Sequence, residues 1–411
     1  MKRVLYLSYD GMTDPLGQSQ VLPYLVGLSK QGYQFTLISF EKKERIEKGR
    51  TGIEKICQES SIEWCPLLYT KTPPVLSTLK DLRALKRKIT SLQSVARFDL
   101  VHCRSYITAL AGEWMKKKWG TKFVFDMRGF WADERVDGKI WNLKNPLFKM
   151  VFNFFKKKEK DFLSHADHII SLTHNAKQVI HSWKEVSNQP VPIQVIPCCV
   201  DLALFDPATI KNASIDQLKA ELGIPSEVEV ISYIGSIGTW YMLPEMLDFF
   251  KQWLSKKPES VLLFVTNDNP DHILMAAGKA GITAASIRIK PATRTEVPLF
   301  IAACDYSLFF IKPVFSKKAS SPTKQGEIMA MGKPVICNSN VGDTDYVVKE
   351  YHSGVLVNDF SNTDYNKAIE EVTGNDHFNA VTIREGARQF FSLEEGVRRY
   401  AEVYHTVLNE G

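Results

Sequence analysis

Residues 321–335 read Ser-Pro-Thr-Lys-Gln-Gly-Glu-Ile-Met-Ala-Met-Gly-Lys-Pro-Val, and this stretch decides the fold class. Ser321 is a favourable N-cap and Pro322 suits the first helical position, so a helix is predicted to begin here. The helical pattern runs to Met331, and a buried strand is predicted directly after it at Pro334–Cys337. A helix followed at once by a short apolar strand is typical of a parallel sheet covered by helices.

The same alternation extends outward over the whole chain. Strands are predicted in the first half at Val4–Ser8, Phe35–Phe40, Leu100–Cys103, Phe123–Asp126, His168–Leu172 and Ile193–Ile196. In the second half they are predicted at Val228–Ile234, Val261–Thr266, Ile287–Lys290, Tyr306–Ile311, Pro334–Cys337 and Gly354–Val357, with further helices at Met242–Lys256 and Asp343–Glu350. The pattern restarts after residue 200, which predicts an α/β protein with two tandem Rossmann-like, doubly wound domains facing a cleft.

We place the first domain at residues 1–205 and the second at 206–392. The last helical stretch, Leu393–Leu408, is long enough to cross back onto the first domain, so residues 393–411 are assigned to that role. A chain of 411 residues is also longer than one core usually serves.

Composition narrows the class of protein. Apolar residues make up 44% and charged residues 24%, which is ordinary for a soluble globular protein. No apolar run approaches the ~18 residues that span a bilayer, and the N-terminus does not resemble a signal peptide. The seven cysteines lack any Cys-x-x-Cys spacing, so we expect neither a zinc site nor a disulfide framework, and a cytoplasmic location.

Charge is distributed unevenly along the chain. Residues 1–205 hold 32 Lys and Arg against 20 Asp and Glu, whereas residues 206–411 hold 20 against 26. A basic first half indicates an anionic partner. No nucleic-acid-binding motif is present, so an anionic membrane surface or a phosphate-bearing substrate is favoured and nucleic acid is not.

The predicted helix start near Pro322 is the strongest candidate for a binding site. Free N–H groups around Ser321, Pro322 and Thr323 suit an anion, and Lys324 adds a full charge in the same turn. Glu327 lies three residues on, where a carboxylate accepts sugar hydroxyls. The alternative is an ordinary capped helix with a solvated Lys–Glu pair.

A glycine-containing loop follows the first strand in each of the two domains. Gly17 lies in the loop 10–19, and Gly235 and Ser236 follow Val228–Ile234. Each glycine allows the backbone to approach a ligand closely, although a plain strand-to-helix turn is an alternative. Neither half carries the dinucleotide-binding or Walker fingerprint, which disfavours NAD-dependent redox chemistry and P-loop phosphoryl transfer.

Charged residues also end the central strands of the first domain. Asp126 ends the predicted strand Phe123–Asp126 and Arg128 follows it, and these two are our candidates for the catalytic residues that orient the acceptor or the transferring sugar. Candidate acceptor-binding residues are Asp10, His102, Arg104 and Glu134. The alternatives are a structural ion-pair network and, for His102, a hydrogen-bonded core histidine.

Lysines mix with aromatic residues in 114–119 and in 148–158. Such a mixture is typical of an interfacial surface that attracts anionic lipid, and equally of a core helix with a solvated lysine face.

Asp343 and Asp345 have the spacing of a metal-binding pair but follow Gly342 at a helix start, where an N-cap is the simpler interpretation. We therefore expect no metal.

These stretches together resemble the GT-B glycosyltransferases, and among them glycosyltransferase family 4 and its bacterial surface-polysaccharide relatives. The likeness rests on Gly17, residues 195–201 followed by Phe205, Gly235, and residues 327–335. It implies that a nucleotide-sugar binds mainly to the C-terminal domain and the acceptor to the N-terminal domain.

Carried over by position, Glu327 matches the ribose-binding glutamate of the family, residues 321–324 match its diphosphate-binding turn, and Gly17 matches the loop near the phosphates. This chain departs from the family at Ala319 and Ser236, where a glutamate and an arginine are usual, and Arg128 replaces a histidine. We infer that Lys324 and Arg294 supply the lost positive charge.

The resemblance implies a metal-independent enzyme without a cofactor. It is expected to transfer a hexose from a UDP- or GDP-sugar to a lipid-linked glycan acceptor, with retention, in surface polysaccharide biosynthesis on the inner face of the membrane. The alternatives are a non-catalytic binding subunit of a glycosyltransferase complex and a nucleotide-sugar 2-epimerase.

Overall fold

The computed structural model describes residues 2–187, 191–374 and 378–409 of the chain. The chain divides into two compact units, which are Met1–Pro197 with Leu393–Gly411, and Cys198–Ser392. We placed the domain boundary after residue 205, whereas the structure divides the chain earlier, between Pro197 and Cys198. Phe205 is fully buried in the core of the second unit, and the Val200 amide donates to the Phe391 carbonyl within that unit.

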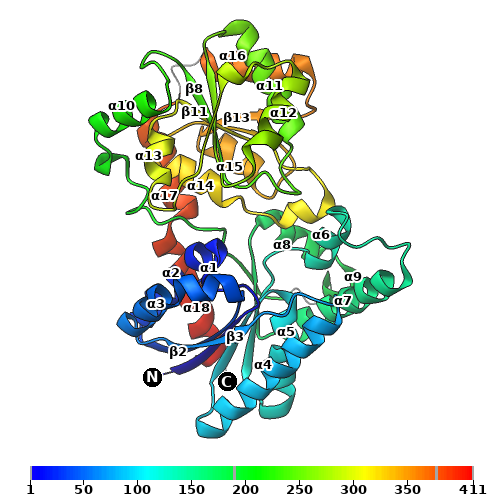
Figure 1. The fold of residues 1–411 in the computed structure, drawn as a ribbon. Coiled ribbons are helices and arrows are strands. Elements are labelled where there is room, and N and C mark those ends of the chain that lie inside the picture. Colours follow the sequence, from blue (N-terminus) through cyan, green and yellow to red (C-terminus); the bar gives the residue numbers. More distant parts are fainter. Residues whose placement is uncertain (1, 188–190, 375–377, 410–411) are drawn as a thin grey trace. The chain divides into compact units, whose positions relative to one another are not determined.

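The first unit is built on a parallel sheet, coloured from blue to green in Figure 1. Among the described residues, seven strands pair in the order β3-β2-β1-β4-β5-β6-β7. Their bounds are β1 Lys2–Ser8, β2 Tyr33–Glu41, β3 Glu63–Leu68, β4 Leu100–Arg104, β5 Lys122–Asp126, β6 His168–Ser171 and β7 Ile193–Val195. Strands such as β4 are buried along their whole length, because helices cover both faces of the sheet.

The helices of this unit are α1 Pro15–Gln20, α2 Leu22–Ser29, α3 Lys43–Glu59, α4 Leu76–Val95, α5 Ser105–Trp119, α6 Trp131–Asp137, α7 Pro146–His165, α8 His174–His181, α9 Lys184–Ser187 and α18 Leu393–Asn409. Helix α18 packs against α2 (Figure 1, red on blue), and its buried residues recur every three or four positions. Gly27 permits the close approach, since a Cβ there would lie 2.6 Å from a Val397 methyl group.

The second unit has a parallel sheet of six described strands in the order β10-β9-β8-β11-β12-β13. The strands are β8 Val230–Ile234, β9 Val261–Val265, β10 Ile287–Lys290, β11 Tyr306–Phe309, β12 Val335–Asn338 and β13 Gly354–Val357. The α-helices are α10 Asn212–Glu221, α11 Leu243–Lys256, α12 Pro270–Ala280, α13 Val297–Ala302, α14 Thr323–Ala330, α15 Thr344–Glu350, α16 Asn362–Thr373 and α17 Ala380–Phe391. The prediction of an α/β fold with two parallel-sheet, Rossmann-like domains is therefore confirmed.

The start of α14 differs from the prediction. The helix begins at Thr323, and Pro322 occupies the N-cap with extended backbone angles, φ −69° and ψ 109°. Ser321 does not cap this helix, because its Oγ accepts a hydrogen bond from the Cys198 amide at 3.1 Å. The prediction of Ser321 as the N-cap was wrong, since its hydroxyl group binds the Cys198 amide and not an amide of α14.

Candidate functional site

The loop after β8 and the first turn of α14 lie together in the second unit. Gly235 has φ +108°, a conformation that L side chains rarely adopt. A Cβ on Gly235 would lie 3.5 Å from Lys324 Nζ. The structure thus brings together Gly235 and Lys324, which the sequence analysis selected independently. Pro322 is buried at the same helix start, and Thr323 is half-buried beside it.

Lys324 is a buried amine between aromatic rings. Its Nζ lies 4.1 Å from the ring centre of Tyr233 and 3.6 Å from that of Tyr241. Among the described residues, no atom forms a hydrogen bond with this Nζ. Burial holds the pKa of Lys324 well below its usual value, and Glu327 opposes this effect only in part. A buried nitrogen without a hydrogen-bond partner costs free energy unless a ligand satisfies it, so the Lys324 amine is a candidate for contact with an anion.

Glu327 lies one turn further along α14 and forms an ion pair with Arg294. Arg294 Nη1 lies 2.7 Å from Glu327 Oε1, and the Arg294 guanidinium also packs over the Phe205 ring at 5.3 Å. Burial raises the pKa of Glu327, and the charges of Arg294 and Lys324 offset this effect only in part. Glu327 is thus paired with Arg294 and influenced electrostatically by Lys324.

Ser236 has an acidic neighbour. Its Oγ donates to Asp268 at 3.1 Å, and the Tyr233 hydroxyl group donates to the Ser236 carbonyl at 2.6 Å. Asp268 also accepts from the Ile237 amide. Asp268, which follows β9 and shapes the glycine loop, was not among the predicted site residues.

A second group of charges ends the central strands of the first unit. Strand pairing sets Arg104 beside Asp126. Arg104 Nε lies 3.3 Å from Asp10 Oδ2, and Arg128 Nη1 lies 3.8 Å from Asp126 Oδ2. Arg104 Nη1 has no hydrogen-bond partner among the described residues. The structure therefore joins four of the predicted residues, whereas Glu134 lies in the first turn of α6.

Asp126 is the fully buried member of this group. Burial raises the pKa of its carboxyl group, but Arg128, His102 and Arg104 together outweigh burial, and the pKa ends below its usual value. Arg128 adopts φ +55°, an uncommon angle for arginine. Because Asp126 is held as a carboxylate, Arg128 keeps a fixed counter-ion.

The prediction that His102 binds the acceptor requires correction. Its side chain is 0% exposed, the Tyr404 hydroxyl group lies 2.8 Å from Nδ1, and Asp126 Oδ2 lies 3.4 Å from Nε2. Burial lowers the pKa of His102. Both ring nitrogens are occupied inside the core, so the alternative of a hydrogen-bonded core histidine holds.

Gly17 is required by packing within its own loop. A Cβ at this position would lie 2.2 Å from the Gly11 carbonyl oxygen. The loop is also held by Glu41, a fully buried residue that ends β2 and accepts from the Met12 amide at 2.6 Å and from the Thr13 hydroxyl group at 2.6 Å. Glu41 was not among the predicted site residues, although it ends a buried strand as Asp126 does.

Two lysines of α7, Lys156 and Lys158, form ion pairs with acidic residues. Lys156 lies 2.8 Å from Asp133 Oδ2, and Lys158 lies 2.9 Å from Glu113 Oε2. These contacts fit the structural interpretation of the basic stretch for two of its lysines. The same helix exposes an apolar stripe, with Leu147 45%, Met150 61% and Phe154 46% exposed.

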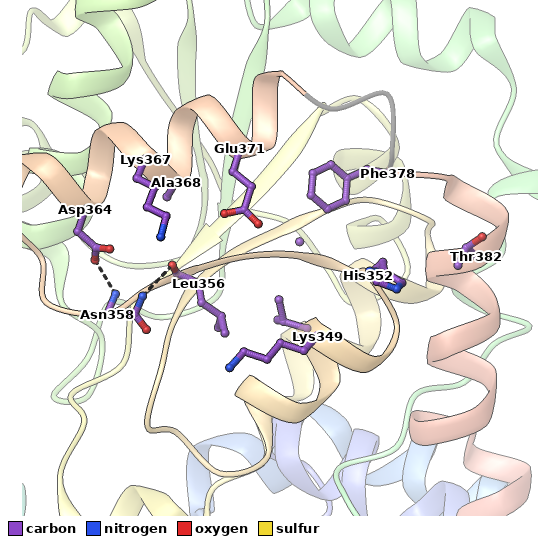
Figure 2. Close-up of a pocket in the computed structure, with 12 residues that line it drawn as sticks. Lys349, His352, Leu356, Asn358, Asp364, Lys367, Ala368, Glu371, Phe378 and Thr382 are labelled. Atoms are coloured by element: carbon purple, nitrogen blue, oxygen red, sulfur yellow. Dashed lines mark hydrogen bonds between the residues drawn. The ribbon is translucent and has the colours of Figure 1, made fainter.

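A hollow of about 880 Å³ lies elsewhere in the second unit (Figure 2). Its lining residues come from α15, β13, α16, α17 and the segments between them: Val348, Lys349, His352, Gly354, Leu356, Asn358, Asp364, Lys367, Ala368, Glu371, Phe378 and Thr382. None of the predicted site residues lines it, and most of its charged side chains reach solvent. The buried atoms Lys324 Nζ and Arg104 Nη1, which form no hydrogen bond among the described residues, are stronger indications of a site.

No group of three or more His, Cys, Asp or Glu side chains in the described part of the chain could hold a metal ion. No helix there is long and apolar enough to cross a membrane.

Known proteins resemble both units. The family model described as Glycosyltransferase Family 4 matches residues 20–204, and the one described as Glycosyl transferases group 1 matches residues 214–389. A D-inositol 3-phosphate glycosyltransferase from a Nocardioides species is 24% identical over 332 residues, which cover 76% of this chain and 68% of that protein.

Two solved structures share the two-domain GT-B fold over the full length of both chains. Sucrose-phosphate synthase from Thermosynechococcus elongatus superposes with a TM-score of 0.72 at 14% identity, with 100% of each chain covered. A glycosyltransferase from Rickettsia africae superposes with a TM-score of 0.71 at 16% identity and the same coverage.

Proposed function

We propose that this chain, which belongs to the GT-B glycosyltransferases of the family 4 type, transfers a sugar from a UDP- or GDP-sugar to a lipid-linked glycan acceptor with retention. The reaction needs no metal ion in this proposal. It takes place at the cytoplasmic face of a membrane and serves surface polysaccharide biosynthesis. The observation that carries the proposal is the buried Lys324 amine at the start of α14, which forms no hydrogen bond among the described residues.

The donor diphosphate is assigned to Lys324 and the N–H groups of Thr323 and Lys324 at the start of α14. A bound diphosphate favours the protonated form of Lys324, so both supply positive charge where negative charge develops as the diphosphate leaves. Gly235 leaves room for the phosphates, since it carries no Cβ toward Lys324. Glu327 is assigned to the ribose hydroxyls, and Arg294 holds its carboxylate in place.

The acceptor is assigned to the residues at the carboxyl edge of the first unit's sheet. Arg104 and Arg128 are both mostly buried, with side chains 5% and 8% exposed, and Arg104 Nη1 has no partner among the described residues. Arginine binds phosphate through paired N–H groups. We therefore assign a phosphate group of the acceptor to this pair, with Asp126 as the catalytic positioning anion. A relative whose name includes inositol 3-phosphate supports an anionic acceptor.

Membrane contact is assigned to the exposed stripe of α7. Leu147, Met150 and Phe154 share one face of the helix because they are spaced by three and four residues. Lys149 and Lys157 are exposed on the same helix. An apolar stripe flanked by lysines favours an anionic bilayer surface.

A transfer assay tests the function. UDP- and GDP-sugars are offered with vesicles that contain a polyprenyl-diphosphate-linked sugar, or with inositol 3-phosphate in solution, and products are identified by mass spectrometry and NMR. We expect transfer to the vesicle-bound acceptor with retained configuration, and no transfer by Lys324→Met. Transfer to inositol 3-phosphate alone would contradict the lipid-linked acceptor, and interconversion of the nucleotide-sugar without acceptor would indicate an epimerase.

Vesicle flotation tests the membrane surface. The double variant Met150→Ser, Phe154→Ser should lose binding to vesicles of phosphatidylglycerol. Charge reversal at Lys156 or Lys158 is unsuitable, because both lysines form ion pairs within the unit. The matched control is Leu274→Ser, Met275→Ser on α12, where two exposed apolar residues are removed elsewhere. Equal binding by both variants would contradict the assignment.

A further inference from the structure

Two tyrosines of α18 reach the charged group of the first unit. Tyr400 and Tyr404 lie one helical turn apart on the buried face of α18 and are 3% and 0% exposed. The Tyr400 hydroxyl group donates to Asp126 Oδ2 at 3.1 Å. The Tyr404 hydroxyl group lies 2.8 Å from His102 Nδ1. Two residues near the end of the chain thus contact the ends of β4 and β5.

The geometry fixes which atoms carry hydrogen. Asp126 Oδ2 lies 3.4 Å from His102 Nε2 and, as a carboxylate oxygen, can only accept, so Nε2 carries the proton. Nδ1 is then the acceptor for the Tyr404 hydroxyl group. Tyr6 stacks on the His102 ring at 4.4 Å and holds its plane. Because burial lowers the pKa of His102, the ring stays neutral with this single N–H.

Asp126 Oδ2 therefore receives hydrogen bonds from two buried donors, Tyr400 and His102, and also faces Arg128 Nη1 at 3.8 Å. The titratable and charged groups that surround this carboxylate are Tyr6 on β1, His102 and Arg104 on β4, Arg128 after β5, and Tyr400 and Tyr404 on α18. Hydrogen bonds to the charged form stabilise it. The remaining oxygen, Oδ1, has no hydrogen-bond partner among the described residues.

We propose that Tyr400 and Tyr404 are positioning residues for the transfer reaction. Tyr400 holds the Asp126 carboxylate directly, and Tyr404 holds it through the tautomer of His102. The oriented carboxylate in turn sets the place of the Arg128 guanidinium at the sheet edge. The role given to Arg128 rests on the proposed function, whereas the hydrogen-bond order is a property of the first unit by itself.

The variants Tyr400→Phe and Tyr404→Phe remove one hydroxyl group each and keep the rings. The matched control is Tyr24→Phe, because Tyr24 packs against Tyr400 at 5.2 Å and its hydroxyl group donates to the Pro197 carbonyl. Turnover of the nucleotide-sugar is measured against pH with saturating acceptor. In Tyr400→Phe we expect about a tenfold fall in kcat, an unchanged donor KM, and an acid limb moved to higher pH. Tyr24→Phe should keep the wild-type profile.

NMR of protein labelled with ¹⁵N at histidine gives a second readout, with His102→Gln used to assign the resonance. We expect a neutral Nε2–H tautomer in wild type and a changed Nδ1 resonance in Tyr404→Phe. Unchanged His102 resonances, or identical pH profiles for Tyr400→Phe and Tyr24→Phe, would overturn the proposal. A wild-type protein that turns over no nucleotide-sugar would refute the proposed function, and the NMR arm separates that failure from a failure of the hydrogen-bond network.

Discussion

Arg294 Nη1 lies 2.7 Å from Glu327 Oε1, and this ion pair ties the segment after β10 to α14. The two partners differ in exposure, since the Arg294 side chain is 32% exposed and that of Glu327 is 9% exposed. The guanidinium can therefore swing into solvent while the carboxylate stays in place. This difference in exposure suits a Glu327 carboxylate that gives up its hydrogen bond from Arg294 and accepts hydrogen bonds from the hydroxyl groups of a bound ribose.

Removal of the charge at Glu327 should weaken nucleotide binding. An amide accepts hydrogen bonds less strongly than a carboxylate, so Glu327→Gln is expected to raise the Kd of the preferred nucleotide about tenfold. Isothermal titration calorimetry measures the change. The control is Glu371→Gln, an exposed glutamate at the hollow of Figure 2, which should bind as wild type does. Equal affinities in the two variants would contradict the ribose assignment.

Lys324→Met should separate binding from stability. The substitution removes a buried amine that has no hydrogen-bond partner among the described residues and leaves an apolar side chain between the Tyr233 and Tyr241 rings. We expect the free energy of unfolding to stay equal or rise by about 1 kcal/mol, since a buried charge costs free energy. Nucleotide affinity should fall at least tenfold.

The control for that experiment is Lys333→Met, which removes a lysine whose pKa is also lowered by burial. It lies beyond the end of α14 and should leave nucleotide affinity unchanged. Denaturant unfolding and calorimetry are run on both variants. A Lys324→Met protein that is strongly destabilised but still binds nucleotide normally would show that the amine serves the fold.

His102 should make stability depend on pH. Its pKa in the folded protein lies below the unfolded value of 6.5, so the unfolded chain takes up a proton first as the pH falls. The free energy of unfolding is therefore highest above pH 6.5 and decreases below it, by up to about 1.4 kcal/mol per pH unit from this residue. Urea unfolding between pH 7.5 and 5.5 measures this slope. The variant His102→Gln should reduce the slope. The control His405→Gln, at an exposed position of α18, should leave the slope as in wild type.

Gly17 and Gly52 form a contrasting pair for backbone substitution. Gly17→Ala should destabilise the first unit by about 1–3 kcal/mol, because its Cβ would overlap the Gly11 carbonyl. Gly52→Ala on α3 meets nothing within 4 Å and should stabilise the protein by up to about 1 kcal/mol. Equal unfolding midpoints would show that the loop can open at little cost.

Much of the fold could be predicted because strands buried on both faces appear as apolar runs, as in β8 and β9. Strand β3 was missed. It lies at the sheet edge, has only one buried residue, and contains Glu63 and Pro66. The start of α14 was misplaced by one residue, since the partner of Ser321 lies far back in the chain at Cys198.

The candidate site was predictable where its residues end strands or begin helices, as for Asp126 and Lys324. Their partners were not predictable in the same way. The contacts of Tyr400 with Asp126 and of Tyr404 with His102 join residues from distant parts of the chain, and α18 gives only an apolar periodicity in the sequence. The pairing of Lys156 and Lys158 was likewise hidden, because the acids that neutralise them lie partly on other helices.

The most direct test of the account is nucleotide binding by the second unit's charged group, measured in the full chain. Thermal unfolding is followed with UDP, GDP, ADP and CMP and with their sugar conjugates, for wild type and for Lys324→Met. We expect one nucleotide at 100 times its Kd to stabilise the wild type by about 2.7 kcal/mol, and to shift Lys324→Met far less. Equal shifts in both proteins, or none with any nucleotide, would contradict the assignment of the donor site to Lys324.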